Sequence, residues 1–231
     1  MIKLNVREMA DKYIQENFKR LVDGIEFLNN TRTVSKTARF GTTKNYTEFE
    51  EDGNLRFGGE ATVWRDINLG GISLTKAASN QPNQISLNGT NNLVFAFEGS
   101  SKINEAHGNF ELQHDYKEGT NLSPHIHWYP TNTNVGNVKW NIDYYISRGT
   151  KAALSGTISV VASTQSVAWE EIRSDFPNIV GSSLNIGNQI HFRIYRDPTD
   201  AEDTYGSDAA IATLGVHYEI DTIGSRDMDD K

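Results

Sequence analysis

The stretch from Leu122 to Ile146, LSPHIHWYPTNTNVGNVKWNIDYYI, constrains the fold more than any other part of the chain. Two runs within it alternate between apolar and polar residues with a period of two, which is typical of half-buried antiparallel strands. In the first run, Ile126 and Trp128 share one face. The link between the runs, TNTNVGN, consists of residues that favour tight turns. The stretch therefore predicts two strands joined as a hairpin.

The two faces of each predicted strand differ in chemistry. The first strand places His125, His127 and Tyr129 opposite its apolar residues. The apolar face of the second strand consists of Val138, Trp140, Ile142, Tyr144 and Ile146, and its other face of Lys139, Asn141, Asp143 and Tyr145. We predict that Trp128 and Trp140 are core residues of adjacent strands and that each loses most of its exposure.

The composition excludes several classes of protein. The net charge of -8 argues against nucleic-acid binding, which needs a basic surface to neutralise phosphates. No apolar run is long enough to span a membrane, and the first residues lack the apolar core of a secretion signal. The absence of cysteine rules out disulfides and thiolate metal ligands, and it fits assembly in a reducing cytoplasm. A length of 231 residues suits one large domain, or one domain with an appendage.

The N-terminal residues predict the one convincing helix, from about Val6 to Leu28. Apolar residues spaced by four, three, four and three positions form a heptad seam, namely Ile14, Phe18, Leu21, Ile25 and Leu28. The seam covers only about two heptads, so a coiled coil of this length is marginal on its own. We therefore interpret residues 1–30 as a helix that oligomerises the chain or anchors it, with packing on its own domain as the alternative.

Residues 31–58 are polar, rich in Thr and Asn, and without a clear apolar period. We predict an extended linker with one short strand at most. From residue 59 to residue 231 the chain is a succession of short alternating runs separated by turn-forming residues, which indicates an antiparallel sandwich or barrel. The predicted strands are Glu60–Ile67, Gln84–Leu87, Leu93–Glu98, Asn109–Asp115, His125–Tyr129, Val138–Ser147, Thr157–Ala162, Val167–Ile172, Gln189–Arg196 and Ala210–Ile220, with a short helix near Ile67–Ala78.

The histidines give the one metal-like signal. Gly119, followed after five residues by His125 and then by His127, resembles the opening of the cupin metal motif. The glutamate that cupins supply next is missing here, because Trp128 and Tyr129 follow. We therefore expect no tightly held metal and no cofactor, although a trimeric fibre could also gather six such imidazoles on its axis. The residues that could complete a site from other strands are His191, His217 and Glu219.

Other catalytic patterns are weak, so an enzyme is disfavoured. There is no Gly-x-Ser-x-Gly elbow, no phosphate-binding glycine loop and no cysteine nucleophile. Glu170 and Glu171 are adjacent in a predicted strand, so their side chains point to opposite faces and cannot act on one glycosidic bond.

Four short patterns lie in the last three quarters of the chain, namely GEATVWRD from Gly59, LQHDYKEGTNLSPHIHW from Leu112, GNVKW from Gly136 and GVHYEIDTIGS from Gly215. Together they resemble a family of tailed-phage virion proteins with a jelly-roll domain, which occur as head fibres, capsid decorations or tail-associated proteins. The resemblance leaves the helix and linker outside it.

The resemblance implies a jelly-roll-like sandwich that has a structural role in a phage particle. It further implies a homotrimer that is attached by its N-terminal segment to capsid, portal or tail proteins, and a location in the virion after assembly in the host cytoplasm. Two alternatives stay open. The chain could be a carbohydrate- or receptor-binding module of the particle that recognises a host surface glycan, or, less favoured, a cupin-like metal-dependent enzyme.

Overall fold

The structure is a computed structural model that describes residues 12–21, 23, 38–51, 53–225 and 227–228. The chain divides into two compact units between Glu60 and Ala61. Within the described residues, no helix combines the length and the apolar character that a membrane span requires.

The N-terminal unit begins with a helix over residues 12–21. Three apolar side chains of the predicted seam, Ile14, Phe18 and Leu21, are 64%, 67% and 60% exposed. Their spacing of four and three places them on one face of the helix. The remaining seam residues, Ile25 and Leu28, lie outside the described residues.

The rest of the N-terminal unit is a three-stranded antiparallel sheet of β1 (Ala38–Gly41), β2 (Asn45–Phe49) and β3 (Leu55–Gly59), in that order. This corrects the prediction of an extended linker with one strand at most. Thr42, one of the residues that suggested a linker, instead closes the first turn. The hydroxyl of Thr42 accepts hydrogen bonds from the backbone N–H groups of Asn45 at 3.0 Å and Lys44 at 3.3 Å, which turns the chain from β1 into β2.

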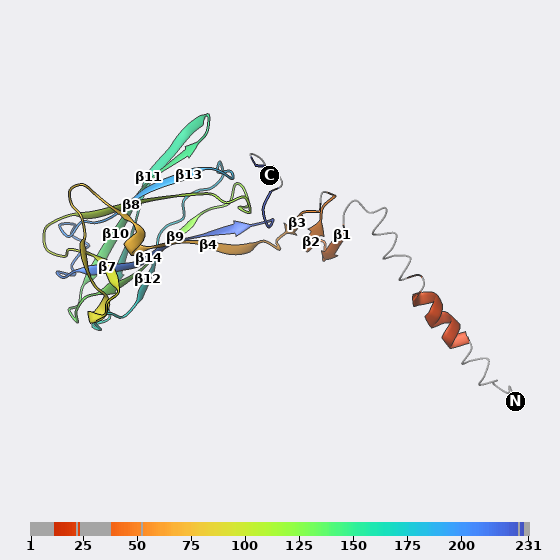
Figure 1. The fold of residues 1–231 in the computed structure, drawn as a ribbon, viewed down its shortest axis with the longest axis horizontal. Coiled ribbons are helices and arrows are strands. Elements are labelled where there is room, and N and C mark those ends of the chain that lie inside the picture. Colours follow the sequence, from red (N-terminus) through yellow and green to blue (C-terminus); the bar gives the residue numbers. More distant parts are fainter. Residues whose placement is uncertain (1–11, 22, 24–37, 52, 226, 229–231) are drawn as a thin grey trace. The chain divides into compact units, whose positions relative to one another are not determined.

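The C-terminal unit is an antiparallel sandwich of two sheets, which confirms the predicted fold class (Figure 1). One sheet has the order β11-β10-β13-β8-β5, and the other has the order β12-β9-β14-β7-β6, with β4 also paired to β14. The strands of the first are β5 (Thr75–Lys76), β8 (Asn104–Glu111), β10 (Asn137–Arg148), β11 (Lys151–Ser163) and β13 (Gln189–Arg196). Those of the second are β4 (Val63–Gly70), β6 (Asn83–Ser86), β7 (Leu93–Phe97), β9 (Ser123–Pro130), β12 (Ile172–Asp175) and β14 (Ala209–Ile220).

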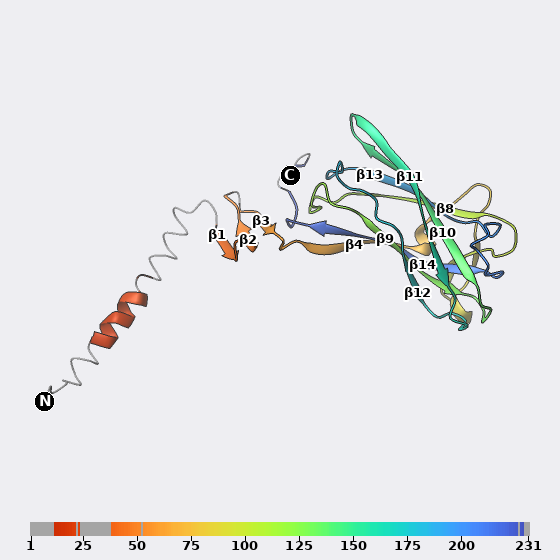
Figure 2. The same cartoon turned by 180° about the vertical axis from the view of Figure 1, so that it is seen from behind.

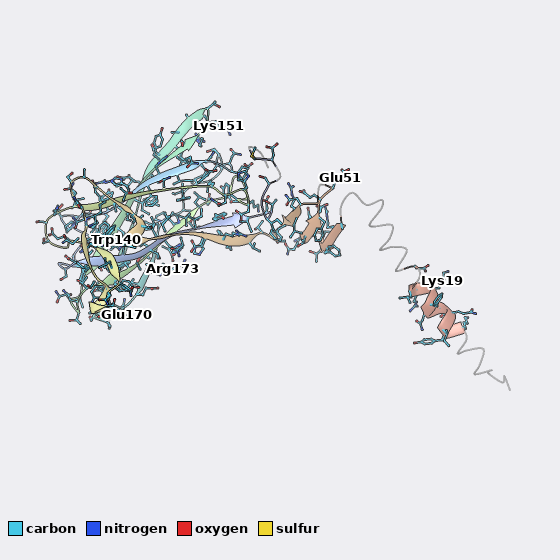
Figure 3. The ribbon with its side chains drawn as sticks, viewed as in Figure 1. Lys19, Glu51, Trp140, Lys151, Glu170 and Arg173 are labelled. Atoms are coloured by element: carbon cyan, nitrogen blue, oxygen red, sulfur yellow. The ribbon has the colours of Figure 1, made fainter. Side chains whose placement is uncertain are left out.

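The predicted hairpin between the strands of Leu122–Ile146 does not form. Strand β9 pairs with β12 and β14 in one sheet, and β10 pairs with β11 and β13 in the other. The polar link therefore crosses from one sheet to the other. Trp128 and Trp140 are core residues as predicted, since both are 0% exposed, but the prediction that their strands are adjacent is wrong. They meet across the core from opposite sheets, with ring centroids 6.0 Å apart at an interplanar angle of 66°, and Figure 3 shows Trp140 within the sandwich.

Two other predicted elements differ from the structure. The predicted strand Val167–Ile172 is a loop up to Glu171, and β12 begins at Ile172. The short helix predicted near Ile67–Ala78 is reduced to a single 3-10 turn, η1 (Gly71–Ser73), and Ile67 belongs to β4. Strands β10 and β11 are longer than predicted and form a hairpin that projects beyond its neighbours, as both views show (Figures 1 and 2). Lys151 lies at its tip (Figure 3).

A buried ion pair fixes the loop that follows β13. The guanidinium of Arg196 donates to both carboxylate oxygens of Asp203 at 2.8 Å, and the two side chains are 0% and 1% exposed. The same guanidinium donates to the carbonyl oxygens of Phe97 at 3.1 Å and Ser207 at 2.7 Å, and to that of Tyr205. The partners of Arg196 are thus a buried carboxylate and three backbone carbonyl groups. Through them this arginine holds β13, the end of β7 and the loop before β14 in fixed positions.

Candidate functional site

The outer face of the six-stranded sheet carries a cluster of histidines. Antiparallel pairing places His217 of β14 opposite Asp66 of β4, and His125 of β9 opposite Gly215 of β14. One potential ligand atom each from Asp66, His125 and His217 lies within 4.8 Å of the other two. Pairing of three strands that are far apart in the sequence thus brings two imidazoles and a carboxylate together.

His125 is the buried member of this cluster, with a side-chain exposure of 2%. Its ring stacks on that of His217, with centroids 4.4 Å apart and planes 19° from parallel. Its Nε2 lies 3.8 Å from Oδ2 of Asp66, and its Nδ1 is buried without a hydrogen-bond partner among the described residues. Burial lowers the pKa of His125 below its usual range, although the charge of Asp66 opposes this effect. The lowered pKa favours the neutral ring, in which one nitrogen carries the proton and the other has a free lone pair.

His127 borders the cluster, with its ring centroid 5.3 Å from that of His125. Its Nδ1 lies 2.9 Å from Oε1 of Glu171. On the next strand, Arg173 of β12 pairs with Asp175 at 2.8 Å; Figure 3 labels this arginine on the ribbon. The charged neighbours of the cluster are thus already paired with one another.

The remaining sequence candidates for metal binding lie elsewhere. His191 is on the outer face of the other sheet, opposite Tyr145. Glu219 accepts a hydrogen bond from the Thr62 hydroxyl at 2.9 Å and pairs with Lys117 at 3.4 Å. The sequence analysis did not select Asp66, because no spacing links an isolated aspartate in a strand to histidines much later in the chain.

A second candidate site is the outer face of the five-stranded sheet, which we name the tyrosine face. Facing residues form cross-strand rows, with Tyr145 beside His191, and Arg193 between Asp143 and His107. A shallow depression of about 270 Å³ lies among these side chains. The tyrosine face consists of Glu105, His107, Asn109, Asn141, Asp143, Tyr145, His191, Arg193 and Tyr195.

Hydrogen bonds hold the centre of the tyrosine face in place. Arg193 donates to Oδ2 of Asp143 at 2.9 Å and also to Glu105. Its guanidinium lies 4.0 Å from the ring centroid of Tyr195. Burial, together with the charge of Asp143, raises the pKa of Tyr195, so its hydroxyl stays protonated. By contrast, the ring of Tyr145 is 53% exposed at the edge of the depression.

The six-stranded sheet also carries aromatic residues. Trp64 of β4 is 59% exposed, whereas Tyr129 and Trp169 are used in packing. Trp169 and Tyr129 have ring centroids 6.2 Å apart, and they cover the buried side chains of Val94, Ala96 and Ala210. Trp169 adopts a φ of 64°, which folds the loop back over this patch. The tyrosine face combines an exposed aromatic ring, that of Tyr145, with an adjacent depression.

No protein-family model and no curated protein sequence matches the chain. Among solved structures, the chain is similar to the family 36 carbohydrate-binding module of a multidomain xylanase from the hindgut metagenome of Trinervitermes trinervoides. The sequence identity is 16% and the TM-score is 0.37, and the match covers 66% of this chain and 96% of that one. The chain is also similar to a family 35 carbohydrate-binding module from Clostridium thermocellum, at 9% identity and a TM-score of 0.37 over 66% and 97%.

A third similar structure is the exo-β-1,3-galactanase of Phanerochaete chrysosporium with galactose, at 11% identity and a TM-score of 0.36 over 75% of this chain and 33% of that one. Likeness at this level carries no functional argument. What the structure itself defines is a class of fold, an antiparallel β-sandwich with an N-terminal helix.

Proposed function

We propose that residues 61–231 form a carbohydrate-binding module without catalytic activity, and that its ligand lies on the tyrosine face. The observation that supports this most is the exposed ring of Tyr145 beside a depression lined by His107, His191 and the Arg193–Asp143 pair. A sugar ring has an apolar side of C–H groups and a rim of hydroxyls. An aromatic face next to fixed donors and acceptors complements both.

The charges on the tyrosine face favour a neutral glycan. Asp143 and Glu105 both pair with the single guanidinium of Arg193, so these three groups sum to one negative charge. An anionic sugar would meet that charge, whereas hydroxyl groups can accept from the imidazoles and donate to the carboxylates. The same pairing argues against glycoside hydrolysis, which needs two carboxylates free to flank the scissile bond.

Replacing Tyr145 by alanine is expected to weaken binding of a neutral linear oligosaccharide roughly tenfold, because the stacking surface is lost. The measurement is calorimetric titration, after a glycan array that includes neutral and acidic oligosaccharides has identified the probe. Trp64→Ala is the matched control, since Trp64 is also an exposed aromatic, at 59%, but belongs to β4 of the other sheet. Failure of every array glycan to bind, or equal affinity in the Tyr145 variant, would contradict the proposal.

A virion role for the whole chain is compatible with such a module and is our second candidate. It is supported by the exposed stripe of Ile14, Phe18 and Leu21, whose burial would stabilise an assembly by roughly 1.5–3 kcal/mol per side chain. We propose that this helix joins copies of the chain into a homotrimer or anchors them to other virion proteins. The sandwich would then be displayed as the head.

Removing residues 1–60 is expected to leave a folded, monomeric sandwich with about one quarter of the mass of a full-chain trimer, because the oligomerising helix is lost. Light scattering measures the mass, and circular dichroism checks that the β-sheet signal persists. Leu21→Asp in the full chain should also release monomers, with about one third of the trimer mass, because it places a charge in the seam. A full chain that is already monomeric at micromolar concentration would rule out the trimer, and an unfolded truncation would show that the sandwich needs the N-terminal unit.

A further inference from the structure

We propose that Asp66, His125 and His217 bind one divalent transition-metal ion, such as Zn²⁺, on the outer face of the six-stranded sheet. Two imidazoles and one carboxylate are a donor set that suits zinc, nickel, copper or cobalt, whereas calcium and magnesium prefer all-oxygen sites. The sequence analysis expected no tightly held metal because the glutamate of the cupin motif is missing. Asp66, brought opposite His217 by the pairing of β4 with β14, is a candidate for the third ligand.

The spacing of the ligand atoms fits an ion better than a hydrogen bond. Nε2 of His125 and Oδ2 of Asp66 are 3.8 Å apart, which is too far for a hydrogen bond between them. Two ligands of a tetrahedral zinc, with bonds of about 2.0–2.1 Å, lie roughly 3.3 Å from each other. A small rotation of the exposed Asp66 side chain therefore brings these two atoms to bonding distance on either side of an ion.

The backbone leaves room for the ion next to these two ligands. Strand β14 has Gly215 at the position opposite His125, between Asp66 and the imidazole. A Cβ at Gly215 would lie 2.4 Å from Nε2 of His125 and 3.1 Å from Oδ1 of Asp66. Any side chain at this position would occupy the space between the two ligand atoms. A glycine in the middle of a long central strand costs stability, and here it keeps that space open.

His125 gives a second, independent indication. It is almost fully buried, yet its Nδ1 has no hydrogen-bond partner and its Nε2 lies beyond hydrogen-bond distance of Asp66, within the part of the chain that the structure describes. Burying an unpaired polar group is costly, and most buried histidines avoid it. A metal bound at Nε2 gives that nitrogen the partner that Asp66 does not provide, and Nδ1 then carries the ring proton.

The other two ligands can adjust, because His217 is half-buried and the side chain of Asp66 is 33% exposed. The rings of His125 and His217 are stacked, so His217 has to turn about its side-chain bonds to aim a nitrogen at the ion. His127, whose Nδ1 is held by Glu171, lies next to the site with its Nε2 available. A carboxylate that orients the far nitrogen in this way is the usual support of a metal-binding histidine. Either Nε2 of His127 or water completes the tetrahedron.

The test is a calorimetric titration of Zn²⁺ into the full chain, produced without a histidine tag and freed of metal with a chelator. We expect one equivalent to bind, and Ca²⁺ and Mg²⁺ to give no binding in parallel titrations. Asp66→Asn and His217→Gln should each weaken zinc binding roughly tenfold or more. His191→Gln is the matched control, because this histidine lies on the other sheet, and it should leave the affinity unchanged.

A third variant, Gly215→Ala, should also abolish binding, because its methyl group fills the space beside His125. The melting temperature of each metal-free variant shows whether it still folds, and Asp66→Asn and His217→Gln alter partly exposed side chains to keep that risk low. Replacement of Zn²⁺ by Co²⁺ adds a spectroscopic signal of tetrahedral coordination. Absence of stoichiometric zinc binding, or equal loss in His191→Gln and His217→Gln, would overturn the proposal.

Discussion

Replacement of Trp140 by alanine is expected to lower the free energy of unfolding by roughly 3–5 kcal/mol, as large aromatic truncations in cores do. Its ring is fully buried and packs edge-on against Phe97 at 5.2 Å and against Trp128 at 6.0 Å between centroids. It thus fills the centre of the space between the two sheets, where a cavity cannot easily collapse. Chemical denaturation of the variant and the parent chain measures the difference.

The two tryptophans should respond differently to phenylalanine. Nε1 of Trp128 donates to the Ser174 hydroxyl at 3.0 Å, whereas Nε1 of Trp140 is buried without a partner among the described residues. Trp128→Phe therefore loses a hydrogen bond that Trp140→Phe does not, and it should be the more destabilising of the two. Tyr145→Ala, at an exposed site on β10, should change stability by less than about 0.5 kcal/mol. A loss below 1 kcal/mol for Trp140→Ala would show that this tryptophan is not central to the core.

Changing Arg196 to methionine should cost roughly 3–5 kcal/mol, because it leaves the carboxylate of Asp203 buried without its counter-charge. The ion pair is bidentate and fully buried, so salt should screen it little. The stability loss, measured by denaturation, is therefore expected to be similar at low and high ionic strength.

The double variant Arg196→Met with Asp203→Leu separates the two parts of this effect. It removes both charges, so it should regain the portion of stability lost to the unpaired carboxylate. It cannot regain the portion due to the carbonyl oxygens of Phe97, Tyr205 and Ser207, which the guanidinium also satisfies. A double variant as unstable as Arg196→Met alone would mean that the carbonyl contacts, and not the ion pair, stabilise the loop.

The alternation of apolar residues predicted the strands of the sandwich well but not their partners. In β10, the apolar residues Val138, Trp140, Ile142 and Ile146 are buried, as expected. Alternation tells which side chains share a face, but it does not say which strand lies alongside. The link TNTNVGN suits a tight hairpin and a crossing between sheets equally well, so the pairing of β9 with β10 was predicted wrongly.

The candidate sites could be predicted only in part, for a related reason. His125 and His217 were recognised by residue type, and their strands by periodicity, but the register that places Asp66 beside them depends on pairing between distant segments. The tyrosine face likewise required the order β10-β13-β8, which no local pattern specifies. Trp169 was assigned to a strand because it is apolar and aromatic, whereas its positive φ follows from a patch that only the folded sheet creates.

The position of β14 has a consequence for how the chain is made. This strand pairs with β4, β7 and β9, and all three leave the ribosome before it does. Until β14 arrives, the six-stranded sheet lacks its central member and its other strands expose unpaired edges. The six-stranded sheet therefore forms late, through contacts between distant segments. Until β14 has been synthesised, the nascent chain is prone to aggregation. Chaperone demand during synthesis should thus depend on how quickly the last part of the chain follows the first.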